Sequence, residues 1–159
     1  MRRLVAGVAI GGAVLFVAAQ AVPYGGFHAN PPVRAEPAWH GPRTRELAVR
    51  ACFDCHSNET AWPWYASVAP VSWLVQRDVD TGRRRLNFSE WDRVQKEAWE
   101  SSKSVRRREM PPWSYTVPQA RARLSATERR AVAEGFDATF GTKRSRGGAG
   151  YAGQGESDR

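Results

Sequence analysis

Cys52-Phe53-Asp54-Cys55-His56 is the most informative segment of the sequence. Two cysteines separated by two residues and followed by a histidine form the attachment pattern of a c-type haem. Thiols at this spacing can add to the two vinyl groups of one haem, and the adjacent His56 can ligate the iron. Cys52 and Cys55 are the only cysteines of the chain. The pattern predicts one covalent haem c, held by Cys52, Cys55 and His56.

Three other interpretations of the cysteine pair remain open. A thioredoxin-like redox pair would need strands alternating with a helix, and the sequence shows no such alternation. A structural zinc site would need four ligands, but no second cysteine pair is present. A disulfide leaves the neighbouring His56 unexplained. The haem interpretation is favoured because the pentapeptide is complete and the chain begins with an export segment.

The first 22 residues predict a signal sequence or a membrane anchor. Arg2 and Arg3 precede an uncharged run from Leu4 to Val22, and a bilayer span needs about 20 apolar residues. Cleavage after Ala21 is the alternative, because small residues stand at the right spacing there. An uncleaved anchor is favoured, with the two arginines inside the cell. The haem domain is then expected in the periplasm, tethered to the inner membrane.

The remaining chain divides into three parts. Residues 23–42 are rich in proline and glycine, which predicts an extended linker that holds the domain away from the membrane. His28 and His40 lie in it and are expected to be solvated surface groups. Residues 43–141 are expected to form the haem-binding domain. Residues 142–159 lack an apolar period and are expected to be disordered.

An all-α domain is predicted, because no segment alternates clearly enough to indicate a strand. Helices are expected from Thr44 to about Cys52 and from Pro70 to Gly82. A third is expected from a cap at Ser89, with Trp91, Val94, Ala98 and Val105 buried, to the arginines at 106–108. Ser125-Ala126-Thr127-Glu128 is a full capping box for a last helix that carries Val132, Phe136 and Phe140 and stops at Gly141.

Met110 is the predicted sixth ligand of the iron. It is the only methionine after the initiator, and Pro111 and Pro112 follow it. A thioether is a soft ligand suited to haem iron, and the prolines restrict the loop that carries it. The alternative is a methionine that fills a gap in the core. The block Trp62-Pro63-Trp64-Tyr65 is expected to wrap a haem edge, and an arginine of the runs 83–85 or 106–108 could pair with a propionate.

These features resemble the bacterial haem-binding domain family, small single-haem proteins that are similar to cytochromes c and have an N-terminal membrane segment. The similarity covers roughly residues 43 to 141. It is carried in order by Cys52-Phe53-Asp54-Cys55-His56-Ser57-Asn58-Glu59-Thr60, Trp62-Pro63-Trp64-Tyr65, Ala69-Pro70-Val71-Ser72-Trp73, Gly82-Arg83-Arg84, Leu86-Asn87-Phe88-Ser89-Glu90-Trp91, Glu109-Met110-Pro111-Pro112 and Ala122-Arg123-Leu124-Ser125. Such proteins often carry a His-Pro step where this chain has Val117-Pro118, which favours Met110 as the sixth ligand. The resemblance implies one covalent haem and no defined physiological role.

The expected function is transfer of single electrons outside the cytoplasm to an unidentified redox partner protein. Two ligands would saturate the iron, which suits a carrier rather than an enzyme. The formal charge of +8 could steer docking to an acidic partner, whereas export and the absence of a groove-reading motif argue against nucleic acid. A haem-based sensor or ligand-binding module is the first alternative, and a peroxidase-like enzyme is the second.

Overall fold

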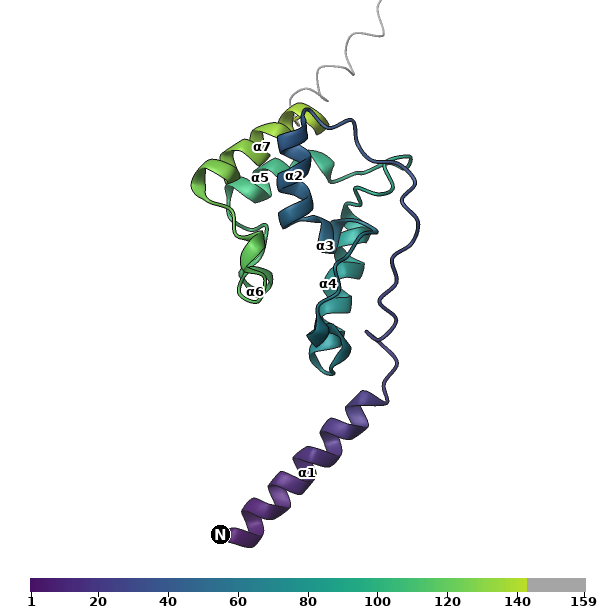
Figure 1. The fold of residues 1–159 in the computed structure, drawn as a ribbon, viewed down its shortest axis with the longest axis vertical. Coiled ribbons are helices and arrows are strands. Elements are labelled where there is room, and N and C mark those ends of the chain that lie inside the picture. Colours follow the sequence, from purple (N-terminus) through teal and green to yellow (C-terminus); the bar gives the residue numbers. More distant parts are fainter. Residues whose placement is uncertain (143–159) are drawn as a thin grey trace, which may run out of the picture.

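The computed structural model describes residues 1–142, and within this range the chain is helical with no strand. The predicted all-α class is therefore confirmed. The elements are α1 (Arg2–Gln20), α2 (Pro42–Ala51), α3 (Phe53–His56), η1 (Trp64–Ser67), α4 (Val71–Arg85), η2 (Ala98–Glu100), α5 (Ser101–Arg106), α6 (Trp113–Thr116), η3 (Ala120–Ala122) and α7 (Ala126–Phe140) (Figure 1). The predicted disordered tail lies outside the described residues from position 143 onward.

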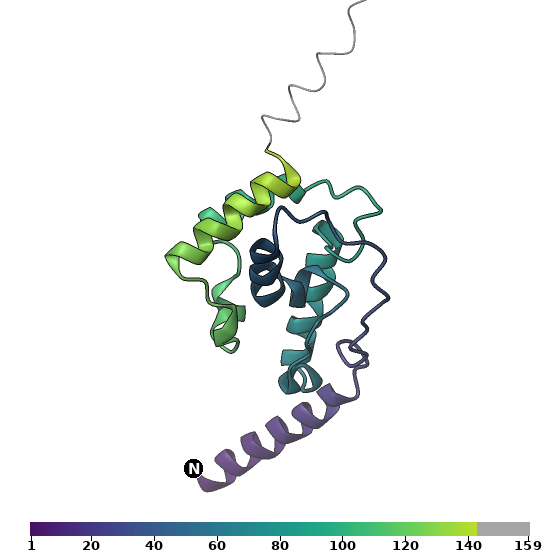
Figure 2. The ribbon, with the colours of Figure 1, turned by 45° about the horizontal axis from the view of Figure 1, so that its top comes forward.

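The last helix of the domain, α7, crosses its first helix, α2 (Figure 1). The capping box is present: the backbone N–H of Glu128 donates to the Ser125 hydroxyl at 3.2 Å, and the Ser125 N–H donates to the Glu128 carboxylate at 2.9 Å. α7 packs on α2 and α5 (Figure 2). The helices can approach closely because Gly135 has no Cβ. A Cβ at this position would collide with the Thr44 side chain. Thr44 is thus buried inside α2, and the helix begins earlier than predicted, at Pro42.

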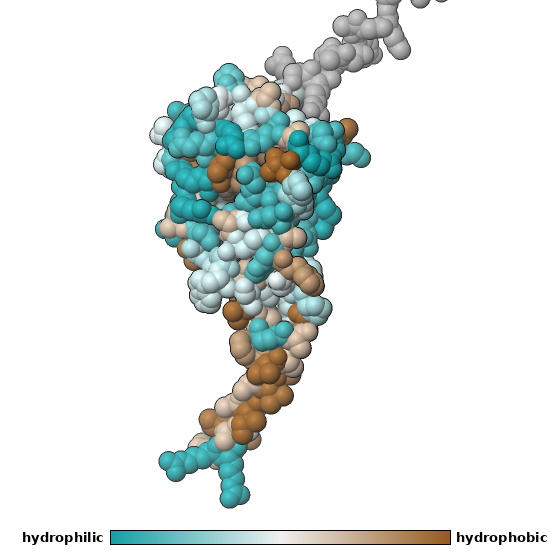
Figure 3. Space-filling view, turned by 45° about the vertical axis from the view of Figure 1, so that its right-hand side comes forward, coloured by the Kyte–Doolittle hydropathy of each residue, from teal (hydrophilic) through white to brown (hydrophobic). Residues whose placement is uncertain are grey.

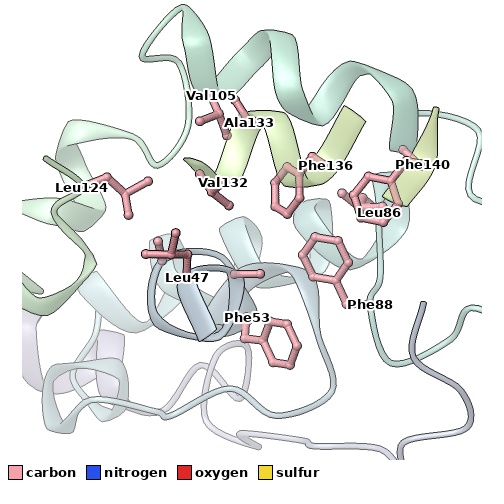
Figure 4. Close-up of a cluster of buried hydrophobic side chains, with 13 residues drawn as sticks. Leu47, Phe53, Leu86, Phe88, Val105, Leu124, Val132, Ala133, Phe136 and Phe140 are labelled. Atoms are coloured by element: carbon pink, nitrogen blue, oxygen red, sulfur yellow. The ribbon is translucent and has the colours of Figure 1, made fainter. Parts of the chain in front are cut away.

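The core lies between these helices and the segment that precedes α5. Figure 4 shows Phe136 and Phe140 of α7 facing Phe88, with Leu47 of α2 and Val132 beside them. All five side chains are buried. The ring of Phe88 stacks on that of Phe140 at a centroid distance of 6.0 Å. Burial of each such side chain contributes roughly 1.5–3 kcal/mol.

Residues 23–41 form no helix, and they pack along the domain instead of holding it at a distance. Trp39 joins the aromatic core, with its ring 5.2 Å from that of Phe88. Arg34 and Ala35 donate backbone hydrogen bonds to the Ser89 carbonyl oxygen at 2.8 and 3.2 Å. The docking of this segment depends on residues far along the chain, which its own composition does not reveal.

The helix predicted from Ser89 onward is wrong over its first half. Residues 90–97 are irregular, and helical structure runs only from Ala98 to Arg106. The hydroxyl of Ser89, instead of capping a helix, accepts from the Asn58 backbone N–H at 2.9 Å. Val94, predicted to be buried, is 80% exposed. Side chains that bond to distant backbone groups compete in this way with helix formation.

α4 continues past its predicted end at Gly82 as far as Arg85. Gly82 is required inside the helix for a different reason: a Cβ there would collide with the carbonyl oxygen of Cys55. The backbone of the Cys52–His56 segment therefore lies directly on α4. This close approach forms one wall of the candidate site.

We predict that Gly82→Ala lowers the free energy of unfolding by about 1–3 kcal/mol, the usual cost of overpacking. Urea unfolding of the full-length protein in detergent, followed by circular dichroism, measures the change. Gly26→Ala is the control, because a Cβ there would meet only Pro23 O, at 3.7 Å. Equal losses in both variants would show that the contact with Cys55 is not what requires glycine.

Candidate functional site

A cavity of about 690 Å³ lies between the Cys52–His56 segment, α4 and the chain around α6. Cys52, Cys55, His56 and Met110 all line it, so the structure brings the four predicted site residues together. A smaller cavity of about 120 Å³ shares Cys52, His56 and Met110 with the first. The two hollows therefore open around the same set of side chains.

The turn between α2 and α3 presents the two thiols. The carbonyl oxygen of Cys52 accepts from the N–H groups of Cys55 and His56 at 3.2 and 2.9 Å, so the segment forms one tight turn. The sulfur atoms of Cys52 and Cys55 are not joined to each other. Burial raises the pKa of both thiols above its ordinary value. A reactive redox pair needs the opposite change, which argues against the thioredoxin-like alternative.

His56 is held in one orientation by the end of α4. The Leu86 carbonyl oxygen can only accept, so Nδ1 of His56, 3.0 Å away, carries the proton and donates to it. Nε2 consequently keeps its lone pair, and Nε2 is the atom that would bind a metal. Burial lowers the pKa of His56 and keeps the imidazole neutral, as ligation requires.

Met110 lies in the loop between α5 and α6, not on a helix face. Its backbone is fixed at two points: its N–H donates to the Ser104 carbonyl oxygen at 3.3 Å, and its own carbonyl oxygen accepts from Arg129 at 3.2 Å. The residue is 39% exposed and borders both cavities. The Met110 side chain therefore faces the hollow and does not fill a gap in the core.

Asp54 joins the attachment segment to the chain that follows Met110. Its Oδ2 accepts from the Tyr115 hydroxyl at 2.5 Å and from Arg121 at 3.0 Å, while Oδ1 accepts from the Ala61 N–H at 3.0 Å. Burial, followed by the bond to Asp54, raises the pKa of the Tyr115 phenol. We call Asp54, Tyr115 and Arg121 the carboxylate bridge. Sequence reasoning missed it, and only the position of Asp54 between the two cysteines hinted at a role.

Other residues singled out in the sequence lie elsewhere. Neither His28 nor His40 lines the cavity: the His28 ring stacks on Trp62 and its Nε2 lies 2.9 Å from the Ala66 carbonyl oxygen. The aromatic block is divided, because Pro63 and Tyr65 line the cavity and Trp64 points to solvent.

Only some of the arginines lie at the cavities. Arg85 lines both cavities, and Arg77, which precedes the first arginine run, lines the larger one. Arg83 instead donates to the carbonyl oxygens of Ser57 and Ala29 at 2.8 and 2.9 Å, and Arg106 pairs with Asp137. Arg85 of the first run and Arg77, which belongs to neither run, thus line the cavity.

The residues of the cavity fit a haem. Its volume lies within the range of roughly 300–1,000 Å³ that is usual for cofactor sites, and apolar side chains such as Val71, Leu74 and Val75 form its α4 wall. An imidazole nitrogen and a thioether sulfur are both haem ligands. A zinc site would lack ligands, because the described residues contain no cluster of three or more His, Cys, Asp or Glu side chains that could hold a metal.

Comparison with known proteins agrees with this chemistry. The haem-binding domain family matches residues 14–138, which is more than half of the chain. The match begins inside α1 and ends inside α7, so it includes every element that borders the cavity. No curated protein and no solved structure matches. The family match and the cavity together establish that the chain belongs to the haem-binding domain family.

Proposed function

We propose that the protein is an exported c-type cytochrome module that binds one haem covalently through Cys52 and Cys55 and transfers single electrons. The observation that carries the proposal is the meeting of Cys52, Cys55, His56 and Met110 at one largely apolar cavity. When bound, the haem supplies an iron that exchanges one electron at a time. The thiols would hold its edge, and the cavity walls would exclude water from its faces.

His56 and Met110 are the residues that would ligate the haem iron. The bond from Nδ1 of His56 to the Leu86 carbonyl oxygen leaves Nε2 available and increases the basicity of the ring. The Met110 thioether faces the same cavity from a loop whose backbone is hydrogen-bonded on both sides. Two protein ligands leave no position for a substrate, which favours an electron carrier over an enzyme or a sensor.

Arg77 and Arg85 are the proposed partners of the haem propionates, because both border the cavity. The net charge of +8 suits an acidic redox partner protein.

We further propose that α1 stays attached as a membrane anchor, with the haem domain in the periplasm. α1 has 19 residues, a mean hydropathy of 1.8 over its most apolar window, and no part of that window buried against the domain. Its last residue, Gln20, is bonded to the domain: the side-chain amide donates to the Ala69 carbonyl oxygen at 3.1 Å and accepts from the Ala69 N–H at 3.0 Å. Cleavage after Ala21 would remove this contact, which supports retention.

We predict that protein expressed with a c-type maturation system keeps its haem through acid extraction and weighs one haem more than the polypeptide. Thioether bonds survive denaturation, whereas iron ligation does not. Mass spectrometry of the denatured chain makes the measurement. Cys52→Ser and Cys55→Ser should weaken retention, and Ser114→Ala, a change at the same cavity, should not. If the denatured wild-type protein has the mass of the bare polypeptide, the proposal of covalent haem attachment is wrong.

We predict that Met110→Leu, which keeps the side-chain volume and removes the sulfur, abolishes the weak sulfur-to-iron band of the oxidised protein. The midpoint potential should fall, and the reduced protein should bind carbon monoxide. Met110→His should restore low-spin iron at a potential below that of the wild type. Wild-type protein that already binds carbon monoxide readily would favour the sensor function.

We predict that Tyr115→Phe weakens ligation by Met110 without removing the ligand. The phenylalanine keeps the ring but leaves the buried Asp54 carboxylate short of one donor, at a cost of about 1.5–3 kcal/mol. Part of the protein should lose the sulfur-to-iron band, and its potential should fall. Tyr65→Phe is the control, because Tyr65 lines the same cavity and its hydroxyl accepts from Gln119. A Tyr115→Phe protein with the wild-type spectrum and potential would exclude this positioning role.

A further inference from the structure

Large hydrophobic side chains outside α1 are unusually exposed at one end of the domain. Among the described residues beyond α1, only Phe27, Trp64, Val94, Trp113 and Val117 are hydrophobic, large and between 62% and 82% exposed. None of these side chains lines either cavity, so a haem would not cover them. Isolated exposed hydrophobic residues are ordinary. Four of these five, however, belong to segments that are connected to the end of α1.

The connection can be followed through hydrogen bonds. Gln20, at the end of α1, bonds to Ala69, which lies between η1 and α4. η1 carries Trp64, and its Tyr65 hydroxyl accepts from Gln119 at 3.2 Å. Gln119 follows α6, the helix that begins at Trp113, and Val117 is the residue directly after that helix. Figures 1 and 2 both show α6 and the first turn of α4 at the end of the domain that lies nearest α1.

The chain between α1 and the domain leaves little freedom for that end to turn away. The Tyr24 hydroxyl donates to Asp80 at 3.4 Å. Gly25 has a φ of +84° and lies so close to α4 that a Cβ would be 2.7 Å from the Ser72 carbonyl oxygen. His28 stacks on Trp62 and bonds to Ala66. Residues 20–28 therefore act as a fixed joint rather than as a flexible spacer.

We propose that Phe27, Trp64, Trp113 and Val117, here called the exposed apolar cluster, rest in the interfacial layer of the bilayer that α1 crosses. The proposal rests on the anchoring proposed above. Tryptophan is enriched at membrane interfaces because its ring is apolar and its N–H can remain hydrated. In Figure 3 pale residues with a few brown ones cover the end of the domain near α1, whereas teal residues with separate brown patches cover the opposite end.

The surrounding charges also favour lipid over a protein surface. Arg123 is exposed and its guanidinium donates to the carbonyl oxygens of Thr116 and Val117 at 3.0 and 3.4 Å, next to the exposed apolar cluster. A basic side chain at this place suits anionic lipid headgroups.

The orientation has a consequence for function. Val71 and Leu74 in the first turns of α4, together with Pro112 and Ser114 near α6, line the large cavity at this same end. With the exposed apolar cluster in the interface, this end of the cavity faces the bilayer. The redox partner is then one that is reached at the membrane surface, not one that approaches from the bulk periplasm.

Photocrosslinking of the full-length protein tests the contact with lipid. Trp64→p-benzoylphenylalanine and Trp113→p-benzoylphenylalanine are reconstituted separately into vesicles of phosphatidylethanolamine and phosphatidylglycerol, irradiated and examined for lipid adducts by mass spectrometry. Val94→p-benzoylphenylalanine is the matched control, because Val94 is as exposed as Trp64 but lies outside the exposed apolar cluster.

We expect lipid adducts at positions 64 and 113 and no lipid adduct at position 94. Equal lipid labelling at all three positions, no lipid labelling at 64 and 113, or labelling of a second protein copy there would overturn the proposal. The readout requires neither haem nor iron ligation. Failure of this experiment would therefore leave the proposed electron transfer standing, and failure of haem attachment would leave the crosslinking result valid.

Discussion

The contact between the backbone of Cys55 and α4 at Gly82 is the constraint on which the site depends. Because no side chain separates the two, the cysteine turn lies flat on the helix and its thiols face the hollow beside it. The same approach brings His56 within 3.0 Å of the Leu86 carbonyl oxygen, which fixes the tautomer of the imidazole. One missing Cβ thus determines the positions of two thiols and the orientation of one ring.

The opposite wall of the cavity is held in a different way. The chain from Met110 to Gln119 has only one short helix, α6, and no buried side chain within that helix. Its attachment to the cysteine turn runs through Tyr115 and the Asp54 carboxylate. Directional polar bonds, rather than apolar packing, therefore set the distance between the loop of Met110 and the thiols, and such bonds specify geometry more narrowly than hydrophobic contact does.

Local patterns were sufficient to predict the parts of the fold that have local causes. The capping box at Ser125 and the apolar face of Val132, Phe136 and Phe140 lie within one helix, and both were confirmed. Ser89 shows the limit: its sequence context resembles a cap, but its hydroxyl bonds to Asn58, 31 positions earlier. Gly82 likewise resembled a helix terminator because the Cys55 backbone that it faces cannot be inferred from its neighbours.

The site shows the same division. The C-x-x-C-H pattern and the single available methionine identified four lining residues, because the chemistry of haem attachment restricts residue type and spacing. The carboxylate bridge could not be predicted, since Asp54 and Tyr115 are 61 positions apart and the C-x-x-C-H pattern leaves the residue type at position 54 open. The docking of residues 23–42 escaped prediction for a related reason: Trp39 is isolated in a proline-rich segment, and only the folded core gives it a partner.

The hollow beside α4 also makes occupancy part of the folding equilibrium. A domain whose apolar wall of Val71, Leu74 and Val75 faces a cavity of about 690 Å³ has an incomplete core until a ligand fills it. Whatever binds there adds its binding free energy to the stability of the native state. Ligand-bound copies are consequently expected to unfold less often and to resist proteolysis longer than ligand-free ones.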